Sequence, residues 1–373
     1  MRVAIIGAGI SGSAFARWLV ETRRHRGEHI EIVVFDKGRR PGGRASSQAS
    51  PRDAAWEADF GAISFSWNPQ ADDLDDGGDT RLNLDPQVSR QLRDWIERGA
   101  LTPAFSCLEG SQRSSTPRWV APSGMGRFVA QILHDLPEVQ LLTSHRVTQL
   151  RRGAHAQGDR STVAWSIEGE ISPGGEVFQE RGFDFIVVTA PPPQAAELLS
   201  EVAPSYAQRL AQVQPYPQWV ARFRGELPWL PTSIVELDHS ESSAIARISA
   251  EGLKRGQVPK TGDELYCVQA TPSWSARHID LERDEIGALL AEELSALTAA
   301  KQPSSAPSPL VFERAHRWRF SGLTRPISGA GADLDPKLGL GCCGDSYSEG
   351  QLLGALNSAA KLLHDYQATW GLE

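Results

Sequence analysis

The sequence is poor in several features that would assign it to a well-known class. It has only four cysteines in 373 residues, Cys107, Cys267, Cys342 and Cys343, without the paired spacing of a disulfide framework or a zinc site. No apolar run approaches the ~20 residues that cross a bilayer, and residues 2–7 follow the first methionine without the segments of a secretory signal. We therefore expect a cytoplasmic protein of a reducing compartment, with no membrane partner.

Positive charge is also in short supply. The chain has 38 Lys and Arg against 46 Asp and Glu, a net charge of −8, so we expect no nucleic-acid partner. The nine histidines are scattered without ligand spacing, and the acidic loop at 72–79 has Gly77 where an EF-hand needs an oxygen ligand. We expect no metal. No serine occupies a G-x-S-x-G element, which argues against a hydrolase triad.

A strand–helix–strand unit opens the chain. Residues 2–6 and 30–35 are short β-branched apolar runs typical of buried parallel strands, and residues 11–22 carry apolar side chains at helical spacing. A G-x-G-x-x-G motif lies between the first strand and the helix and consists of Gly7, Ala8, Gly9, Ile10, Ser11 and Gly12. This context, more than the motif alone, predicts a dinucleotide-binding turn.

Each glycine of the motif has a physical role in such a turn. Gly7 permits the tight turn, Gly9 lets backbone amides approach a pyrophosphate, and Gly12 allows the helix to pack closely on the strand. Asp36 ends the second strand, 24 residues after Gly12, where a carboxylate can accept hydrogen bonds from an adenosine ribose.

Two further segments extend the prediction. Asp36 is followed by Lys37 and then by Gly42, Gly43 and Arg44, which combine exposed amides with a guanidinium and suit a diphosphate. Near the C-terminus, a strand ends in Gly344-Asp345 and precedes an amphipathic helix that begins near Leu352 and Leu353. The first motif is shared by NAD and FAD enzymes, but the second is not typical of dehydrogenases.

On these three segments, the sequence resembles the FAD-dependent amine oxidase superfamily, in which a Gly-Gly-Arg element lies against FAD. The resemblance implies that Asp345 meets the ribityl and phosphate region and that amides near Leu352 and Leu353 face the flavin carbonyl, where they stabilise negative charge. It also implies non-covalent FAD, because Cys342 and Cys343 precede the Gly-Asp turn and do not occupy the usual tether position.

Within the superfamily, the resemblance is to the renalases and their bacterial relatives. It covers segments 59–62, 119–125, 145–150, 183–189, 271–275 and 316–320. It implies oxidation of dihydro-NAD(P) isomers that carry hydride at the wrong ring carbon, with O2 as electron acceptor and NAD(P)⁺ and H2O2 as products. Such an electron-rich ring needs no general base.

Two alternatives remain open at this stage: a flavin-containing amine oxidase, and a flavin-binding module without turnover. Many amine oxidases carry a lysine that holds a water near the flavin N5. This chain has six lysines, none in a strand that we expect over the ring, which weighs against a conventional amine oxidase.

The predicted site residues fall into two groups. Those expected to contact the cofactor are Gly7, Ala8, Gly9, Ile10, Ser11, Gly12, Asp36, Lys37, Gly43, Arg44, Gly61, Ala62, Val147, Gly344, Asp345, Leu352 and Leu353. Those expected beside the substrate are Ile63, Ser64, Trp274 and Trp318, with Arg317 and Arg319 meeting phosphate. The tryptophans are equally compatible with core packing, and the arginines with interior ion pairs.

The predicted fold is α/β, an FAD-binding Rossmann-like domain of the glutathione-reductase type with an inserted mixed α/β substrate domain. We expect the FAD-binding domain to comprise residues 1–66, 119–200 and 310–373, and the substrate domain to comprise residues 67–118 and 201–309. The Pro/Ser-rich stretch at 302–309 cannot sustain a helix and is predicted to link the two.

Overall fold

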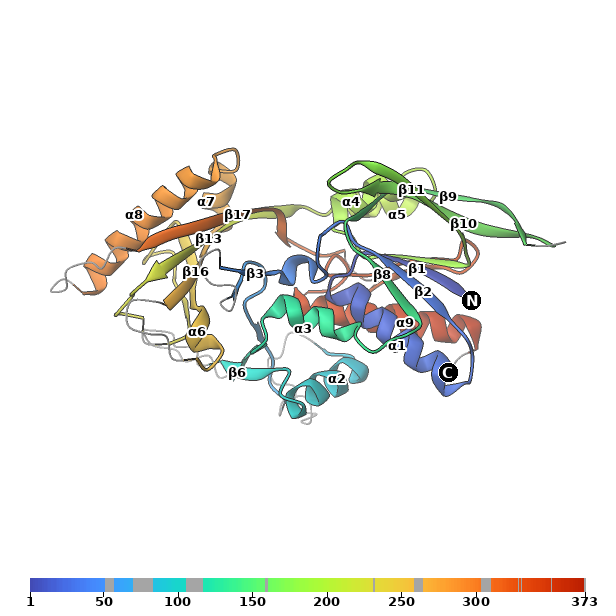
Figure 1. Cartoon of the computed structure of the whole chain (residues 1–373), viewed down its shortest axis with the longest axis horizontal. Coiled ribbons are helices and arrows are strands. Elements are labelled where there is room, and N and C mark those ends of the chain that lie inside the picture. The colour runs from blue at the N-terminus through green and yellow to red at the C-terminus, as the bar shows by residue number, and fades with distance from the viewer. Residues whose placement is uncertain are drawn as a thin grey trace.

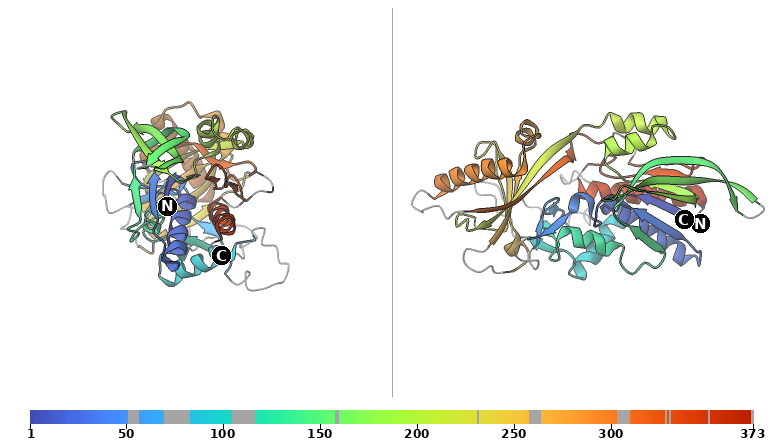
Figure 2. Two further views of the ribbon diagram at one scale, coloured as in Figure 1. Left: turned by 90° about the vertical axis from the view of Figure 1, so that its right-hand side faces the viewer. Right: turned by 45° about the horizontal axis from the view of Figure 1, so that its top comes forward.

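The chain forms an elongated molecule of two lobes, seen side by side in Figure 1. This computed structural model describes residues 1–50, 57–69, 83–104, 117–157, 160–230, 232–257, 264–302, 310–327, 329, 331–349 and 351–371. The acidic loop at 72–79, most of the Pro/Ser-rich linker and Cys107 lie outside the described residues. Both termini lie at the same end of the first lobe (Figure 2).

The first lobe is built on a six-stranded sheet with the order β18-β19-β12-β1-β2-β8. Its strands are β1 (Arg2–Ile6), β2 (Glu31–Phe35), β8 (Val139–Leu142), β12 (Phe185–Val188), β18 (Asp333–Asp335) and β19 (Leu340–Cys342). All neighbours pair in parallel except β18 and β19. The last four residues of β1 and the last four of β2 are apolar and buried. Continuous hydrophobic runs of this kind predict a sheet that is covered on both faces.

Helices cover one face of this sheet. They are α1 (Ile10–His25), α2 (Pro86–Glu97), α3 (Met125–Ile132) and α9 (Leu352–Trp370). Phe15, Trp95, Phe128 and Leu356 from these four helices share one apolar core with Val3 and Val34 of the sheet. Helix α9 ends at Gly371, whose φ of 62° is a left-handed conformation that favours glycine.

The opposite face is covered by a three-stranded antiparallel sheet and two short helices. The strands are β9 (His145–Gln157), β10 (Arg160–Ile171) and β11 (Glu176–Phe183), and the helices are α4 (Pro192–Leu199) and α5 (Pro204–Ala211). Trp165, Phe183 and Leu199 pack against Val33 and Ile186 in a second core. Figures 1 and 2 show these elements across the central sheet from α1 and α9.

A five-stranded antiparallel sheet with the order β14-β15-β16-β13-β17 forms the second lobe. Its strands are β13 (Pro215–Gly225), β14 (Ile234–Glu236), β15 (Ile245–Ala250), β16 (Glu264–Ala270) and β17 (Val311–Leu323). The helices of this lobe are α6 (Glu251–Lys254), α7 (Pro272–Arg277) and α8 (Arg283–Lys301). Trp219, Ala221 and Ala315 on one face of the sheet share a core with Ile286 and Leu290 of α8.

Short elements join the lobes. They are the 3-10 turn η1 (Gly43–Ala45), the hairpin of β3 (Ser47–Ala49) and β4 (Glu57–Asp59), and the small sheet of β5 (Phe65–Ser66), β6 (Thr102–Ala104) and β7 (Arg118–Val120). Phe60 follows β4 and packs with Val220 and Cys267 of the second lobe. The other face of the five-stranded sheet therefore faces the first lobe.

The α/β fold with its parallel sheet agrees with the prediction, but two parts of the predicted division do not. Strand β17 pairs with β13, so residues 311–323 belong to the second lobe and not to the FAD-binding domain. Helix α2 buries Val88, Leu92 and Trp95 in the core of the first lobe, so this part of 67–118 does not belong to the substrate domain. Strand β11 ends at Phe183 and β12 begins at Phe185, and the two strands pair in different sheets.

A fully buried group of charges lies where the lobes meet. The Lys254 Nζ on α6 lies 2.8 Å from the Asp59 Oδ2 on β4 and 2.8 Å from the Glu251 Oε1. Burial alone would raise the pKa of Asp59, but Lys254 and Arg255 outweigh it and hold that pKa below its ordinary value. The Asp59 Oδ1 also accepts the Met125 amide at 3.0 Å, which ties the cluster to α3.

We expect Lys254→Met to lower the free energy of unfolding by about 3–5 kcal/mol, because it removes the nearest cation from two buried carboxylates and leaves them only their longer contacts with Arg255, at 3.6 and 3.4 Å. Chemical denaturation measures the loss. The matched control is Lys361→Met, which removes a half-exposed ion pair with Asp365 on α9 and should cost much less. Equal losses for the two variants would show that the buried cluster does not stabilise the junction.

Candidate functional site

A cleft of about 1580 Å³ runs between the lobes. Its lining comes from the β1–α1 turn, the end of β2, η1, residues 61–64, the start of β9, the segment before α9, and β13 and β17. Segments far apart in the chain therefore converge on one elongated space.

The β1–α1 turn has the backbone geometry that the glycine motif predicts. Gly7 has a φ of 116°, and a Cβ at Gly12 would lie 2.1 Å from the Gly7 carbonyl oxygen, so both positions exclude larger residues. A Cβ at Gly9 would meet nothing within 4 Å. Since Gly9 lines the cleft, its backbone is open to a ligand there.

Asp36 closes one end of the cleft. Its Oδ2 accepts the Ala8 amide at 2.7 Å, and its Oδ1 accepts the Gly38 amide at 2.6 Å. Burial raises the pKa of Asp36, and these two hydrogen bonds oppose that effect. Lys37 beside it donates to the Gln194 Oε1 at 2.9 Å, and burial lowers its pKa. The carboxylate is thus fixed by the same turn that carries the glycine motif.

The Gly-Gly-Arg segment lies directly against that turn. A Cβ at Gly43 would come within 3.3 Å of the Gly9 Cα, so two motifs that are separate in sequence meet here. A Cβ at Gly61 would lie 1.7 Å from the Arg44 carbonyl oxygen, and the Ala62 amide donates to that oxygen at 2.8 Å. Residues 61–62 therefore pack against the backbone carbonyl of Arg44.

The C-terminal motif joins the same place. The Arg44 guanidinium donates to both carboxylate oxygens of Asp345, each at 2.6 Å. The Gly344 amide donates to the Ser358 Oγ of α9 at 3.0 Å, and Leu352, the first residue of α9, lines the cleft. The positive end of the helix dipole therefore opens toward the middle of the cleft.

The second lobe supplies the far wall, and two of the hydrogen bonds that hold it in place end on residues 60–61. The Trp318 Nε1 donates to the Phe60 carbonyl oxygen at 2.6 Å, and the Gln269 Nε2 donates to the Gly61 carbonyl oxygen at 2.7 Å. His316 packs edge-on against Trp318 with ring centroids 4.4 Å apart, and against Phe60 at 6.3 Å. The wall is thus aromatic beside the 60–62 loop.

Arginines dominate the charge of this wall. Arg247, Arg283, Arg314, Arg317 and Arg319 line it, against Glu282. The Glu282 carboxylate caps the N-terminus of its own helix, α8. Burial, together with Arg283 and Arg314, lowers the pKa of His316 to about 4, so its imidazole is neutral at physiological pH.

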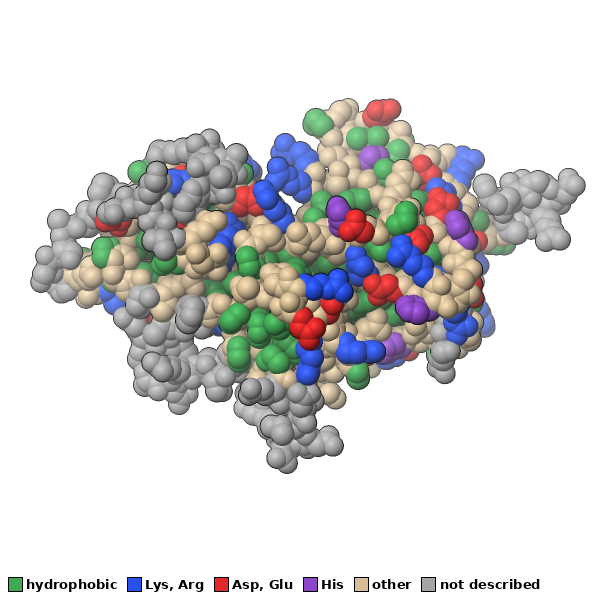
Figure 3. All heavy atoms as spheres, turned by 60° about the horizontal axis from the view of Figure 1, so that its bottom comes forward, with side chains coloured by type: hydrophobic (Ala, Val, Ile, Leu, Met, Phe, Trp, Pro, Cys, Tyr) green, Lys and Arg blue, Asp and Glu red, His purple; other side chains and the backbone are tan. Residues whose placement is uncertain are grey.

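The outer surface differs from this wall. On the face shown in Figure 3, Lys and Arg side chains are interspersed with Asp and Glu over the first lobe. This face therefore lacks the excess of arginines that lines the cleft.

Most of the predicted residues meet in the cleft. Those that line it are Gly7, Gly9, Ile10, Ser11, Asp36, Lys37, Gly43, Arg44, Gly61, Ala62, Ser64, Val147, Arg317, Trp318, Arg319, Gly344, Asp345 and Leu352. Ala8 and Gly12 belong to the turn beneath it, and Leu353 is buried in the core of the first lobe.

Two predicted substrate residues lie elsewhere. Ile63 is fully buried with Val120 and Ile234, because it points away from Ser64, its neighbour in the chain. Trp274 packs in the core of the second lobe, with its ring stacked on His278 at 4.1 Å. Neither residue is among those that line the cleft, so the structure does not bring either of them to the substrate side.

The sequence prediction missed several residues of the wall, above all Arg283, Arg314 and His316. A signal existed for His316 and Arg314, because they precede Trp318 by two and four residues and strand alternation places all three on one face. No comparable signal existed for Arg283, which reaches the cleft from the first residue of α8.

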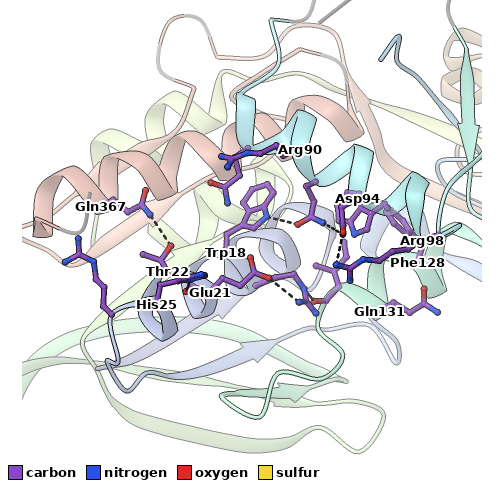
Figure 4. Close-up of a pocket in the computed structure, with 17 residues that line it drawn as sticks. Trp18, Glu21, Thr22, His25, Arg90, Asp94, Arg98, Phe128, Gln131 and Gln367 are labelled. Carbon is purple, nitrogen blue, oxygen red and sulfur yellow. Dashed lines mark hydrogen bonds and ion pairs between the residues drawn. The ribbon is translucent and has the colours of Figure 1, made fainter. Parts of the chain in front are cut away.

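A second hollow of about 780 Å³ lies among α1, α2, α3 and α9, away from this cleft (Figure 4). Several of its polar groups are engaged with one another. The Trp18 Nε1 donates to Gln91 at 3.1 Å, Arg98 pairs with Asp94 at 2.7 Å, and Gln367 donates to Thr22 at 3.0 Å. None of the predicted site residues lines this hollow.

Two family models match the chain. One, for a flavin-containing amine oxidoreductase, matches residues 50–335, and the other, for an NAD(P)-binding Rossmann-like domain, matches residues 5–74. Renalase of Mus musculus is 22% identical to the chain, across 97% of each protein. This similarity extends over both lobes.

Solved structures share the fold at low sequence identity. A putative protoporphyrinogen oxidase from Exiguobacterium sp. 255-15 has a TM-score of 0.66 at 11% identity, over 99% of each chain. An oxidoreductase from Methanosarcina mazei has a TM-score of 0.60 at 13% identity, over 98% of this chain and 100% of that one. A redesigned putrescine oxidase has a TM-score of 0.59 at 11% identity, over 99% of each chain.

The described residues contain no helix long and apolar enough to cross a membrane, and no group of three or more His, Cys, Asp or Glu side chains that suits a metal ion. Since the amine oxidoreductase model covers more than half of the sequence, the chain belongs to the flavin-containing amine oxidoreductase family and is a renalase-like, flavin-dependent oxidoreductase.

Proposed function

We propose that the protein binds FAD non-covalently and oxidises isomeric dihydro-NAD(P), with O2 as the electron acceptor and NAD(P)⁺ and H2O2 as the products. The reaction has a simple balance. Overall, the dihydronicotinamide ring gives up two electrons and one proton, and O2 takes up two electrons and two protons to form H2O2, with the second proton coming from water. When bound, the flavin supplies the two-electron chemistry, and the chain supplies binding, orientation and charge.

The residues of the cleft fit an FAD molecule along its whole length. The Asp36 carboxylate suits the adenosine ribose, and the open backbone at Gly9 with Arg44 suits the diphosphate. Leu352 at the N-terminus of α9 suits the electron-rich pyrimidine edge of the flavin.

Non-covalent binding is supported by the state of the nearby thiols. Cys342 and Cys343 are both buried, and burial raises the pKa of Cys343 to about 12. The Cys343 Sγ lies 3.2 Å from the Ser11 Oγ, beneath the glycine motif. A protonated thiol in that position is a poor nucleophile toward a flavin ring.

One observation carries the choice of substrate: the excess of arginines on the far wall. A primary amine or polyamine is a cation near neutral pH and would be repelled there, whereas the phosphates of a reduced nicotinamide dinucleotide would be attracted. Lys37 is the only lysine among the described lining residues, and it lies beside Asp36 at the other end of the cleft. The wall therefore offers no lysine for a water-mediated amine oxidase mechanism within the described part of the chain.

The aromatic part of the wall orients the substrate ring. Trp318 is fixed by its hydrogen bond to Phe60, and His316 packs on its edge. A flat dihydronicotinamide between this wall and the flavin would have little rotational freedom, which lowers the entropic cost of reaching the reactive geometry. No proton needs to be removed from such a ring, and the neutral His316 adds no charge that would disfavour the nicotinamide cation formed on oxidation.

We expect Asp36→Ala and Arg44→Ala each to lower the FAD content of the purified protein. The first removes the ribose acceptor, and the second removes the guanidinium beside the diphosphate. The ratio of flavin absorbance to protein absorbance measures occupancy. Arg277→Ala, on the exposed side of α7, is the control and should retain its flavin. Full occupancy in both cleft variants would contradict the proposed position of the dinucleotide.

Anaerobic mixing tests the substrate. We expect 2- or 6-dihydro-NAD to bleach the flavin absorbance rapidly and putrescine to leave it unchanged, because only the former is both anionic and electron-rich. Subsequent addition of O2 should restore the yellow form and yield H2O2. Bleaching by the amine alone would favour an amine oxidase, and a flavin that no donor bleaches would favour a binding module without turnover.

The protonation state of His316 is a separate expectation. Its imidazole should remain neutral between about pH 5 and pH 8, the range in which an ordinary histidine titrates, because its pKa is lowered to about 4. NMR titration of ring-labelled protein measures this, with His316→Gln used to assign the signal. An imidazole at this position that titrates near pH 6.5 would show that the nearby arginines do not act on it.

A further inference from the structure

Three arginines of the far wall stand apart from the rest. Among the described residues, the side chains of Arg283, Arg314 and Arg319 have no hydrogen bond or ion pair. The other arginines nearby are engaged: Arg247 pairs with Glu236, Arg222 with Glu313 at 2.8 Å, and Arg317 donates to the Ile279 carbonyl oxygen at 2.6 Å.

Two of these guanidinium groups, those of Arg283 and Arg314, come from different elements but line the same cleft as His316. Arg314 lies on β17, two residues from His316 on the same face of the strand, and Arg283 is the first residue of α8. Both lower the pKa of His316. Two exposed cations without a protein partner among the described residues therefore line the cleft together with one neutral imidazole.

The acidic neighbours of Arg283 do not neutralise it. Glu282 and Glu285 form a capping box, in which each side chain accepts a backbone N–H at the start of α8. The Glu313 carboxylate, next to Arg314, is buried and occupied by Arg222 and Arg224, each at 2.8 Å. The local charge balance at the cleft therefore lacks an anion.

We propose that Arg283, Arg314 and His316 form a subsite that binds a phosphate group of the substrate. This subsite rests on the proposed function and makes it more specific. If the subsite binds a phosphate, the preferred substrate is a nucleotide and not a nucleoside or a free base. Guanidinium groups match phosphate oxygens geometrically, and a neutral imidazole can donate one further hydrogen bond. The N-terminus of α8 contributes partial positive charge of the same sign.

The spacing along β17 agrees with this assignment. Arg314 is four residues from Trp318, a separation of roughly 13 Å at ~3.3 Å per residue. With the nicotinamide ring against Trp318, the ribose occupies the intervening length beside His316 and the diphosphate reaches Arg314. The dinucleotide therefore extends along the strand toward α8, away from the FAD-binding turn.

The test uses the FAD-loaded enzyme and its Arg283→Gln/Arg314→Gln double variant. Titration with NAD⁺ and with oxidised nicotinamide riboside, followed by the flavin absorbance, gives a Kd for each ligand. The Kd ratio of NAD⁺ to riboside should rise about ten- to a hundredfold in the double variant, the range expected for lost hydrogen bonds to a charged group. Arg277→Gln on α7 is the control and should leave the ratio unchanged.

A second probe separates this subsite from the proposed function. Inorganic pyrophosphate, titrated calorimetrically into the same FAD-loaded proteins, should bind the wild type and the control but lose affinity at least tenfold in the double variant, with strong weakening by salt. Pyrophosphate that binds wild type and double variant alike, or binds neither, would overturn the subsite. If dihydro-NAD fails to reduce the flavin while pyrophosphate shows the expected loss, the proposed function fails and the anion subsite stands.

His316 reports occupancy directly. A bound phosphate offsets the two cations, so NAD⁺ should raise the pKa of the imidazole, whereas nicotinamide riboside should not. The same ring-labelled protein measures both titrations. An equal shift with the two ligands would place the phosphates elsewhere.

Discussion

The geometry of the cleft depends on a cation that has no access to water. Lys254 of the second lobe lies 2.8 Å from the Asp59 carboxylate on β4, one of the elements that join the lobes. Separating them would break a buried ion pair that Glu251 and Arg255 replace only in part, which is more costly than breaking a surface ion pair. The junction of the lobes is therefore fixed at the residue that immediately precedes Phe60.

That fixed point determines the position of the far wall. Phe60 and Gly61 offer their carbonyl oxygens to Trp318 and Gln269, so the face of the five-stranded sheet is aligned to the same loop that rests on Arg44. Arg44 in turn joins the glycine motif to Asp345. A short path of contacts thus connects the buried ion cluster, the cofactor segments and the aromatic wall, and each lobe contributes one side of a single cleft.

The sequence predicts the first lobe better than the second for a physical reason. The constraints on Gly7, Gly12 and Gly61 are steric and local, and they are visible as residue types at fixed spacing. The position of β17 depends on its pairing with β13, about a hundred residues earlier in the chain. A local sequence pattern does not indicate such a distant partner, and the predicted domain boundary therefore differs from the structure at residues 311–323. The sequence does not distinguish Trp274 from Trp318, because both are large aromatic residues. Trp274 packs in a core and Trp318 lines the cleft, and only the tertiary packing of the second lobe decides which of the two side chains is covered.

The lobes are connected in a way that bears on how ligands enter. Strands β13 and β17 pair from Pro215 with Leu323, near the first lobe, to Arg224 with Val311, deep in the second, and Figure 1 shows them spanning the gap as a two-stranded ribbon. A ribbon of this kind resists bending more than a loop, because rotation about it would break ladder hydrogen bonds. The connection is therefore stiffer than a single-chain linker, and it restrains the bending of one lobe against the other across the cleft.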